Sequence, residues 1–432
     1  MTDIRKVVKA LVPVNLFKHI EPYGHLVESM FFNVIYGFPA RKMHVIGITG
    51  TNGKTTTTFL IHRMLHEAGY KVGMLSTVAY GVGDDIKPQI EHMTTAKASV
   101  LQKRLRDFKK AGVEWLVLET SSHSLAQHRV WGVPYEIAVM TNVTNDHLDY
   151  HGSFEKYLDA KRQLFVIASG NGRRFGVVNA DDSNAKVFVN SIPNSVTYGI
   201  KGGTLRAKNI NLAADHISYK VSIGDESYDI KVNIPGEFNV SNSLAALAVG
   251  RELGLKPRQI EAGLAALEGV EGRMMIINEG QPFKVIIDFA STPDAFDRLF
   301  ESVRPATKGK LIAVFGSAGR RDEAKRAVQG EIAGRYADEV VLTEEDDRDI
   351  DGQEILEQIA SGAKKAGKIL NKDMFFVHDR AEAIKYAMAR AKSSDDTVVI
   401  LGKGHEKTIE RADGAHPWSE IEITRKALIE TK

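Results

Sequence analysis

His44-Val-Ile-Gly-Ile-Thr-Gly-Thr-Asn-Gly-Lys-Thr-Thr56 is the stretch that decides the fold. Its apolar start, His44–Ile48, predicts a buried parallel strand, and the glycines after it lead into a helical pattern over Thr55–Ala68. A strand, a glycine-rich turn and a helix N-terminus make up a P-loop, in which backbone N–H groups and the helix dipole hold phosphates. The stretch therefore predicts a nucleotide-binding site.

The loop is a variant of the common form. That form has its first glycine five residues before Gly53, where this chain has Ile48, so the phosphate-binding run is Gly50-Thr-Asn-Gly-Lys-Thr55. Lys54 would neutralise charge on the β- and γ-phosphates, and the hydroxyl of Thr55 would reach Mg²⁺. A glycine-rich turn that only connects strand to helix is the weaker alternative.

Composition narrows the class of protein. The chain has 432 residues, a formal net charge of +2 and no cysteine. Its length predicts two or three domains, its near-neutral charge offers no basic field for nucleic acid, and disulfides and thiolate chemistry are excluded. Met1–Phe17 alternates charged and apolar residues, which indicates neither a signal peptide nor a membrane span. We expect a cytoplasmic protein that binds no nucleic acid and no membrane.

Apolar runs alternate with helical patterns from His44 onward, which predicts an α/β fold. Buried strands that alternate with helices form parallel sheets covered on both faces. We therefore expect a P-loop-type parallel sheet in a central ATPase domain and a Rossmann-like C-terminal domain. Between Thr204 and Ile234 the short alternating segments predict a small antiparallel insert.

Three segments follow from this pattern. Residues 1–41 are expected to form a short helical lead-in with loops at Pro13, Pro22, Gly24 and Pro39. Residues 42–271 would be the central domain and residues 272–432 the C-terminal domain. The boundary is placed at a glycine-punctuated stretch that follows a predicted helix.

Acidic and histidine side chains follow two of the predicted strands. Glu119 comes after the buried strand Trp115–Leu118, at the edge where ligands gather in open α/β sheets, and could bind Mg²⁺. Asp146, His147, Asp149 and His151 follow the next strand, at a spacing that suits zinc poorly. Either one imidazole binds a metal shared with phosphate, or the segment only caps a helix and forms a turn.

Ordered motifs along residues 42–432 resemble the Mur ligases, and most of all the branch that adds the third residue of the peptidoglycan stem peptide. They are Gly50–Thr56, Glu119–His123 with Gln127–Arg129, Thr141–Asn142 with Asp146–His151, Tyr157 with Ala160–Lys161 and Leu164–Phe165, Pro235–Asn239 with Asn242, Gly272–Met274, Asp288–Asp294, Phe315–Asp322 and Gly402–Glu406.

The resemblance implies an ADP-forming ligase. ATP would phosphorylate a carboxylate of a muramoyl-peptide-like acceptor, and the amine of an amino acid would attack the acyl phosphate. Phosphoryl transfer depends mostly on positioning and charge neutralisation, so ATP and Mg²⁺ are the expected cofactors. The partners would be small-molecule substrates, and we expect a monomer.

The resemblance also assigns roles to residues. The catalytic set is Lys54, Glu119, His147 and Lys161. The Mg²⁺ ligands would be Thr55, Glu119, His147 and Lys161, the last as a carbamylated lysine. The nucleotide would be bound by Gly50, Thr51, Asn52, Gly53, Lys54, Thr55, Thr56, Asn142, Asn239, Asn242, Arg273 and Asp288. The acceptor would be held by Thr94, Thr95, Ser121, Gln127 and Arg129, and the amino acid by Arg321, Arg348, Gly402 and Glu406.

The chain departs from the family pattern in three places. About 41 residues stand where the family has an N-terminal domain for the uridine diphosphate end, so the acceptor is expected to be held differently or to carry no uridine nucleotide. The Asp-Asn-Pro-Arg signature reads Glu345-Asp-Asp-Arg348, and its extra acids favour a substrate with added positive charge. Phe289 and Ser291 replace a tyrosine and a histidine, which alters an ATP-side contact.

Two alternatives to the leading hypothesis stay open. One is a ligase of the same superfamily with a folate polyglutamate or a free peptide as acceptor. The other is a nucleotide-gated binding protein that has lost ligation, against which the intact set Lys54, Glu119, His147 and Lys161 argues.

Overall fold

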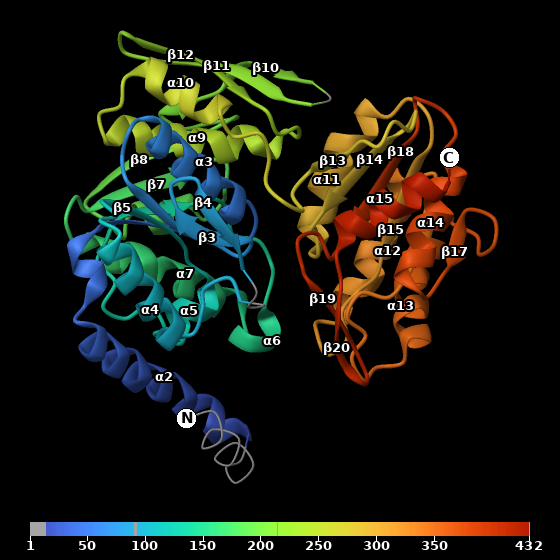
Figure 1. Ribbon diagram of the computed structural model, residues 1–432, viewed down its shortest axis with the longest axis horizontal. Coiled ribbons are helices and arrows are strands. Elements are labelled where there is room, and N and C mark those ends of the chain that lie inside the picture. Colours follow the sequence, from blue (N-terminus) through green and yellow to red (C-terminus); the bar gives the residue numbers. More distant parts are fainter. Residues whose placement is uncertain (1–13, 90–92, 214, 432) are drawn as a thin grey trace.

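The computed structural model describes residues 14–89, 93–213 and 215–431, with side chains from residue 21 onward, as two lobes joined near residue 272 (Figure 1). The first lobe is built on a nine-stranded sheet in the order β4-β3-β2-β5-β1-β6-β7-β8-β9. Its strands are β1 His44–Thr49, β2 Val72–Leu75, β3 Ala79–Val82, β4 Asp85–Pro88, β5 Trp115–Glu119, β6 Tyr135–Met140, β7 Phe175–Asn179, β8 Asn194–Gly199 and β9 Leu205–Arg206.

The core of this sheet is parallel, as predicted. β1 lies between β5 and β6 and runs parallel to both, while β3 and β4 pair antiparallel at one edge. Because side chains alternate along a strand, β1 sends Val45 into one core and Ile46 and Ile48 into the other. The carboxyl ends of β1, β5 and β6 therefore meet at one edge, where the predicted site residues gather.

Helices cover both faces of the first sheet. One core contains residues of α3 Lys54–Glu67, α9 Phe238–Glu252 and α10 Pro257–Ala265, and the other contains residues of α4 Ala98–Lys110, α7 Phe154–Ser169 and α8 Ala185–Val189. The short helices are η1 Pro39–Lys42, α5 Ser122–Ala126 and α6 Leu148–His151. The predicted antiparallel insert is confirmed as β10 Lys208–Leu212, β11 Ile217–Ile223 and β12 Glu226–Val232, but residues 205–206 extend the main sheet instead.

The second lobe has a six-stranded sheet in the order β13-β14-β18-β15-β16-β17, parallel except for β13. Its strands are β13 Met275–Ile277, β14 Lys284–Asp288, β15 Leu311–Phe315, β16 Glu339–Leu342, β17 Met374–Phe376 and β18 Thr397–Leu401, with a hairpin of β19 Thr408–Arg411 and β20 Gly414–Pro417. Its helices are α11 Pro293–Ala306, α12 Ala324–Tyr336, α13 Gly352–Lys365, α14 Arg380–Arg390 and α15 Glu420–Glu430. The α/β class predicted for both units is confirmed.

The N-terminal segment differs from the prediction. Residues 14–36 form one helix, α2 Val14–Tyr36, which continues through Pro22 and Gly24, where loops were expected. An internal proline costs a helix about 3 kcal/mol, and the contacts that α2 makes with α4 offset that cost. Pro39 begins η1, whereas Pro13 lies outside the described residues. Over the described ranges, no helix is long and apolar enough to cross a membrane.

Helices α12 and α13 approach each other closely enough that only glycine fits between them. A Cβ built on Gly362 would lie 1.7 Å from the carbonyl oxygen of Ala327, and one on Gly330 would lie 1.9 Å from the carbonyl oxygen of Ile359. Backbone atoms cannot move aside as a flexible side chain can. The second lobe therefore depends on these glycines for its helix packing.

We expect Gly362→Ala to lower the free energy of unfolding by about 1–3 kcal/mol, because the added methyl group forces the two helices apart. Gly24→Ala is the matched control, since nothing lies within 4 Å of a Cβ at that helical position. Chemical denaturation of both variants would measure the difference. Equal stabilities would contradict the tight contact between α12 and α13.

Candidate functional site

The P-loop between β1 and α3 is shaped by its two glycines. Gly50 has a φ of 152° and Gly53 a φ of 82°, a region that favours glycine. A Cβ on Gly50 would lie 1.9 Å from Oγ1 of Thr141, and one on Gly53 would lie 2.2 Å from Oδ1 of Asn242. The loop is thus packed against the end of β6 on one side and against α9 on the other.

Asn142 holds the loop from β6. Its Oδ1 accepts a hydrogen bond from the backbone N–H of Asn52 at 2.9 Å, and its Nδ2 donates to the carbonyl of Asn52 at 3.1 Å. The backbone N–H of Thr51 donates to the carbonyl of Asn142 at 2.8 Å. These bonds hold the loop against the end of β6.

Two lysines meet under the loop at one carbonyl oxygen. Nζ of Lys54 donates to the carbonyl of Gly50 at 2.9 Å and to that of Thr51 at 2.8 Å. Nζ of Lys161, on α7, donates to the same carbonyl of Gly50 at 2.6 Å and lies 4.4 Å from the ring centroid of Tyr157. Burial lowers the pKa of both lysines, and for Lys161 the charge of Lys54 lowers it further.

Glu119 ends β5 and is fully buried beside the start of α3. Its two carboxylate oxygens each accept from Oγ1 of Thr55 at 3.1 Å. Thr77, which follows β2, donates its backbone N–H to Glu119 at 2.8 Å and its hydroxyl at 2.9 Å. Sequence reasoning missed Thr77, because no local pattern marks a threonine whose partner is 42 positions away.

Three histidines gather near Lys161. The ring centroids of His123 and His147 are 4.6 Å apart, and those of His123 and His151 are 5.4 Å apart. Burial lowers the pKa of His123 to about 2 and that of His151 to about 4. The His147 side chain is 44% exposed, and partial desolvation with the nearby charges of Lys161 and Lys54 lowers its pKa to about 3. At neutral pH the imidazole of His147 is therefore uncharged, which is the form that binds a metal ion.

One cavity of about 840 Å³ connects the two lobes. The first lobe lines it with most of the predicted nucleotide, metal and acceptor residues, namely Thr51, Asn52, Gly53, Lys54, Thr55, Thr56, Thr94, Glu119, Ser121, Gln127, Arg129, Asn142, His147, Asn239 and Asn242. The second lobe lines it with Arg273, Asp288, Arg321, Arg348 and Glu406. The cavity lining does not include Gly50, Thr95, Lys161 and Gly402, which lie behind its wall.

Both lobes contact the P-loop directly. Nη2 of Arg273 lies 3.4 Å from Oγ1 of Thr55, and its guanidinium lies 4.7 Å from the ring centroid of Phe289. Nδ2 of Asn52 donates to Oδ2 of Asp294 on α11 at 2.6 Å.

Asp288 accepts hydrogen bonds from the backbone N–H groups of Met274 and Ala290, both at 2.7 Å, and so orders the segment after residue 272, where the two lobes are joined. Phe289, which stands where the family has tyrosine, supports the guanidinium of Arg273.

Asn239 and Asn242 begin α9 beside the P-loop. Nδ2 of Asn242 donates to Oδ1 of Asn239 at 2.8 Å, and Nδ2 of Asn239 donates to the carbonyl of Pro235 at 2.7 Å. Oδ1 of Asn242 also accepts from the hydroxyl of Thr57. The pair holds α9 against the first turn of α3.

The predicted acceptor residues form a second wall beyond Glu119. The hydroxyl of Thr95 donates to the carbonyl of Glu119 at 3.0 Å and accepts from the backbone N–H of Ser121 at 3.1 Å. Arg129 is buried and donates to the carbonyl of Thr95, and burial lowers the pKa of Arg129 to about 10. Together these contacts join the predicted acceptor residues to the carboxyl end of β5.

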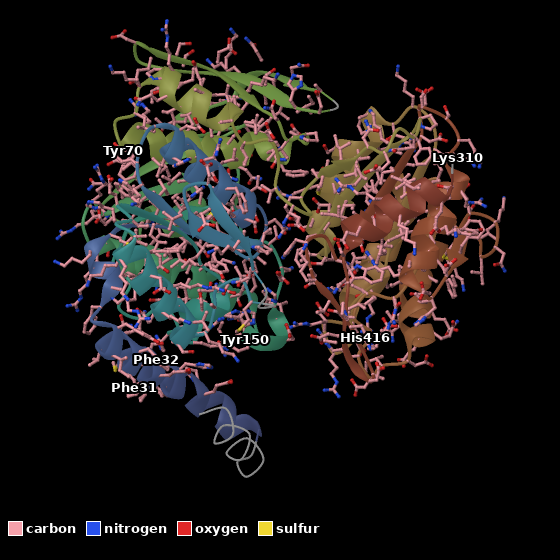
Figure 2. All side chains as sticks on the ribbon, in the orientation of Figure 1. Phe31, Phe32, Tyr70, Tyr150, Lys310 and His416 are labelled. Carbon is pink, nitrogen blue, oxygen red and sulfur yellow. The ribbon has the colours of Figure 1, made fainter. Side chains whose placement is uncertain are left out.

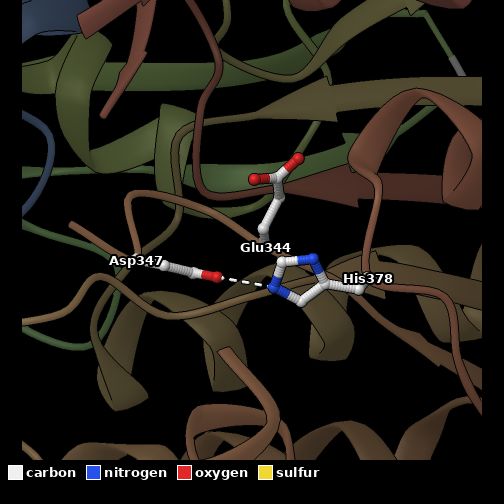
Figure 3. A group of neighbouring side chains, drawn as sticks. All are labelled: Glu344, Asp347 and His378. Atoms are coloured by element: carbon white, nitrogen blue, oxygen red, sulfur yellow. Dashed lines mark hydrogen bonds and ion pairs between the residues drawn. The ribbon is translucent and has the colours of Figure 1, made fainter. Parts of the chain in front are cut away.

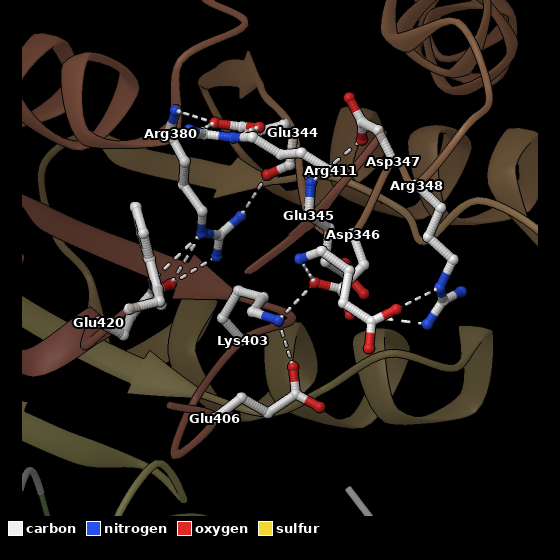
Figure 4. A network of polar contacts seen from close by, with 12 residues as sticks. Glu344, Glu345, Asp346, Asp347, Arg348, Arg380, Lys403, Glu406, Arg411 and Glu420 are labelled. Carbon is white, nitrogen blue, oxygen red and sulfur yellow. Dashed lines mark hydrogen bonds and ion pairs between the residues drawn. The ribbon is translucent and has the colours of Figure 1, made fainter. Parts of the chain in front are cut away.

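Side chains from distant segments contact the acidic run after β16 (Figure 4). Nζ of Lys403 donates to Asp346 at 2.7 Å and also to Glu406. Asp347 pairs with Nε2 of His378 at 2.8 Å. The extra acids Asp346 and Asp347 therefore each contact a side chain from a distant segment of the protein.

Arg348 and Glu345 flank this network on the cavity side. Arg348 has a φ of 57° and donates to Glu410 at 2.8 Å and to the carbonyl of Gly319. Glu345 lines the cavity, and its burial raises the pKa of its carboxyl. A Cβ on Gly402 would lie 2.5 Å from Oε2 of Glu345, so Gly402 makes room for that carboxylate.

Glu344, Asp347 and His378 lie close enough to surround a cation (Figure 3). However, Glu344 already accepts hydrogen bonds from Arg411 at 2.6 and 2.9 Å, and Asp347 pairs with His378. The group is an ion-pair network beneath Arg348 and carries no evidence of a metal site.

Comparisons with known proteins agree with this geometry. Residues 48–250 match the Mur ligase middle domain and residues 272–404 match the Mur ligase, glutamate ligase domain. The chain is 41% identical over 423 residues to a UDP-N-acetylmuramyl-tripeptide synthetase of Roseiflexus sp., with 95% of this chain and 83% of that protein covered. It is 38% identical to a UDP-N-acetylmuramoyl-L-alanyl-D-glutamate--2,6-diaminopimelate ligase of Caldanaerobacter subterraneus, with 92% and 80% covered.

Solved structures show the same fold. A UDP-N-acetylmuramoyl-L-alanyl-D-glutamate--2,6-diaminopimelate ligase superposes with a TM-score of 0.62 at 30% identity, with 90% of this chain and 78% of that chain covered. The MurF ligase of Thermotoga maritima in complex with ADP gives a TM-score of 0.69 at 21% identity, with 93% and 84% covered.

Thr77→Val should raise the Mg²⁺ concentration needed for half-maximal ATP turnover about 10-fold, because it removes a hydroxyl that orients Glu119. A titration of ADP release against Mg²⁺ measures the change, and Thr204→Val, an exposed threonine of the same lobe, is the control. An unchanged Mg²⁺ requirement in Thr77→Val would mean that Glu119 does not act on the metal.

Proposed function

This chain belongs to the Mur ligase family of ATP-dependent ligases, and from that premise we propose that it adds the third residue to a muramoyl-dipeptide acceptor in peptidoglycan synthesis. ATP would convert the acceptor carboxylate into an acyl phosphate. The amine of the incoming amino acid would then attack the acyl carbon, and phosphate would leave as the amide forms. Because the reaction consumes ATP, we place it in the cytoplasm.

The observation that carries the proposal is the shared cavity. Its first-lobe wall holds the P-loop and the acceptor residues, and its second-lobe wall holds Arg348 and Glu406. An acyl phosphate formed at the P-loop therefore faces the wall from which an amino acid would approach. Enclosure between two lobes also keeps water away from an intermediate that hydrolyses readily.

Lys54 is placed to balance the charge of the transferred phosphoryl group. In this structure its Nζ bonds the loop carbonyls, and a triphosphate in the loop would offer it stronger, charged acceptors. Arg273 reaches the same point from the second lobe through Thr55. A lysine and an arginine on opposite lobes can thus bind the phosphates and draw the lobes together.

The residues fit Mg²⁺. The hydroxyl of Thr55 and the buried carboxylate of Glu119 are hard oxygen donors in contact, the ligand type that Mg²⁺ prefers. The uncharged imidazole of His147 and a carbamate on Lys161 would complete a second site. When bound, Mg²⁺ neutralises the developing negative charge on the phosphoryl oxygens.

Lys161 suits carbamylation for a physical reason. Only an unprotonated amine attacks CO₂, forming an N–C bond and releasing a proton. Burial and the nearby charge of Lys54 lower the pKa of Lys161, which favours that neutral form. The resulting anion would stand among Lys54 and the metal ions, where negative charge is stabilised.

The amino acid would be bound by its carboxylate at Arg348. Its guanidinium is held by Glu410 and the carbonyl of Gly319, so it is positioned before the substrate arrives. Glu345 and Glu406 line the same part of the cavity and suit a cationic group on the substrate. A diamino acid fits this arrangement, because its carboxylate would bind Arg348 and its second amine would bind Glu345 and Glu406.

The test of the function is whether ADP release depends on both substrates. A ligase releases ADP only when amino acid and acceptor are both present, whereas a nucleotide-gated binding protein would release it regardless. Acceptors with and without the uridine diphosphate group, and a folate or free-peptide acceptor, would be compared by mass spectrometry of the products. We expect Lys54→Ala and Glu119→Ala to reduce coupled ADP release about 100-fold or more.

Lys161→Ala should likewise lower ADP release about 100-fold and recover in part with short carboxylic acids, which replace the carbamate. Wild-type protein given ¹³C-bicarbonate should show a carbamate resonance that Lys161→Ala lacks. Lys156→Ala, an exposed lysine of the same helix, should behave as wild type. Full activity of Lys161→Ala would remove Lys161 from the metal site.

Arg348→Ala should raise the KM for the amino acid more than the KM for ATP, because it removes a contact made only to that substrate. Steady-state kinetics with each substrate varied in turn would separate the two constants. Arg335→Ala, on the exposed side of α12, is the control. Equal changes in both KM values would place Arg348 elsewhere in the site.

A further inference from the structure

Helix α2 exposes a continuous apolar stripe, which we call the outer face of α2. Its side chains are 38–67% exposed and recur three or four positions apart: Tyr23, Val27, Met30, Phe31, Val34 and Ile35. Apart from Gly24, every exposed residue between 21 and 36 belongs to this stripe. Figure 1 shows α2 at the outer edge of the first lobe, beyond α4, and Figure 2 labels Phe31 on it. In water this arrangement leaves apolar area without a partner.

The polar side of α2 faces the protein instead. His25, Ser29 and Asn33 are buried, and Nδ2 of Asn33 donates to the carbonyl of Trp131 at 2.8 Å. Gly132 lets Asn33 approach, since a Cβ there would lie 2.7 Å from Oδ1 of Asn33. These contacts fix the rotation of α2 about its axis, and the apolar stripe therefore points away from the first lobe.

Cations flank the outer face. The guanidinium of Arg41 lies 4.1 Å from the ring centroid of Phe38, and that of Arg106, on α4, lies 4.7 Å from the ring centroid of Tyr36. Lys42 at the end of η1 is exposed, as are Lys103, Lys109 and Lys110 along α4. The two acids of α2, Glu21 and Glu28, lie within 3.8 Å of His25 on the inner side.

We propose that the outer face of α2 docks on an anionic lipid surface. A helix with an apolar stripe and flanking Lys and Arg side chains lies in the plane of such a surface, with the stripe between headgroups and acyl chains and the cations on lipid phosphates. α2 is 23 residues long, or about 35 Å, and would lie on the bilayer, because no described helix can cross it. The proposal differs from the sequence-based expectation of no membrane partner, and the experiment below decides between the two.

The charges favour lipid over a second copy of the chain. A two-fold dimer through this face would press two identical faces together, each flanked by cations such as Arg41, Lys42 and Arg106. Like charges oppose that contact, whereas lipid phosphates neutralise them. Docking requires no ATP or acceptor, so its test is independent of the proposed ligase activity.

The experiment is sedimentation of the full chain with vesicles. We expect binding to vesicles of phosphatidylglycerol and phosphatidylethanolamine, and at least about 10-fold less binding to vesicles of phosphatidylcholine alone. Raising the salt concentration should weaken the binding, since it screens exposed charges.

Val27→Glu combined with Phe31→Glu should reduce vesicle binding about 10-fold or more, because charged side chains cannot enter the acyl region. The matched control is Ile429→Glu, since Ile429 is 60% exposed on α15 of the other lobe.

Val27→Ser combined with Phe31→Ser removes apolar area without adding negative charge and should also reduce vesicle binding. Arg41→Ala with Lys42→Ala should lose binding only to anionic vesicles. Circular dichroism and ligase activity on a water-soluble acceptor should be unchanged in all variants.

Three outcomes would overturn the proposal. The wild-type chain could stay unbound with every vesicle, or the α2 variants could bind as well as wild type does. Light scattering could instead reveal a dimer that Val27→Glu dissociates, which would make a second copy the occupant. Vesicle binding that appears only after residues 1–13 are deleted would mean that this segment, and not lipid, binds the outer face of α2 in the full chain.

Discussion

The carbonyl oxygen of Gly50 accepts hydrogen bonds from two buried lysines, Lys54 and Lys161, and the rest of the site depends on that meeting. Two cations buried side by side are unfavourable unless an anion joins them, and burial accordingly lowers both pKa values. A triphosphate at Lys54 and the proposed carbamate on Lys161 would both supply negative charge at this point. Electrostatics would thus link nucleotide binding to the proposed role of Lys161.

The second lobe completes the site through contacts that converge on the same loop. Arg273 reaches Thr55, and Asp294 accepts from Asn52. By contrast, Asp346 and Asp347, near Arg348, contact Lys403 and His378 of the protein itself. The two buried lysines thus stand where phosphate would bind, whereas Glu345 and Glu406 line the cavity where the amino acid would be bound.

Helix α2 differs from the two lobes in the kind of side chain that it buries. The lobes bury apolar strands and helices in three cores, while α2 buries Asn33 and His25 and exposes its apolar side. Its orientation is set by the hydrogen bond from Asn33 to the carbonyl of Trp131 and by its packing against α4. A helix that presents apolar side chains in this way is suited to a partner other than water.

The amino-acid sequence by itself determined the P-loop, the parallel strands and the place of Glu119 at a strand end, because these depend on local periodicity and on glycine geometry. It also determined the family, through motifs that stay in order along the chain. Only the tertiary structure decided that Thr77 orients Glu119, that Asp346 and Asp347 contact Lys403 and His378, and that α2 continues through Pro22. The partners in those contacts lie tens of positions apart, and the net effect of a charge or a proline depends on what the fold places beside it.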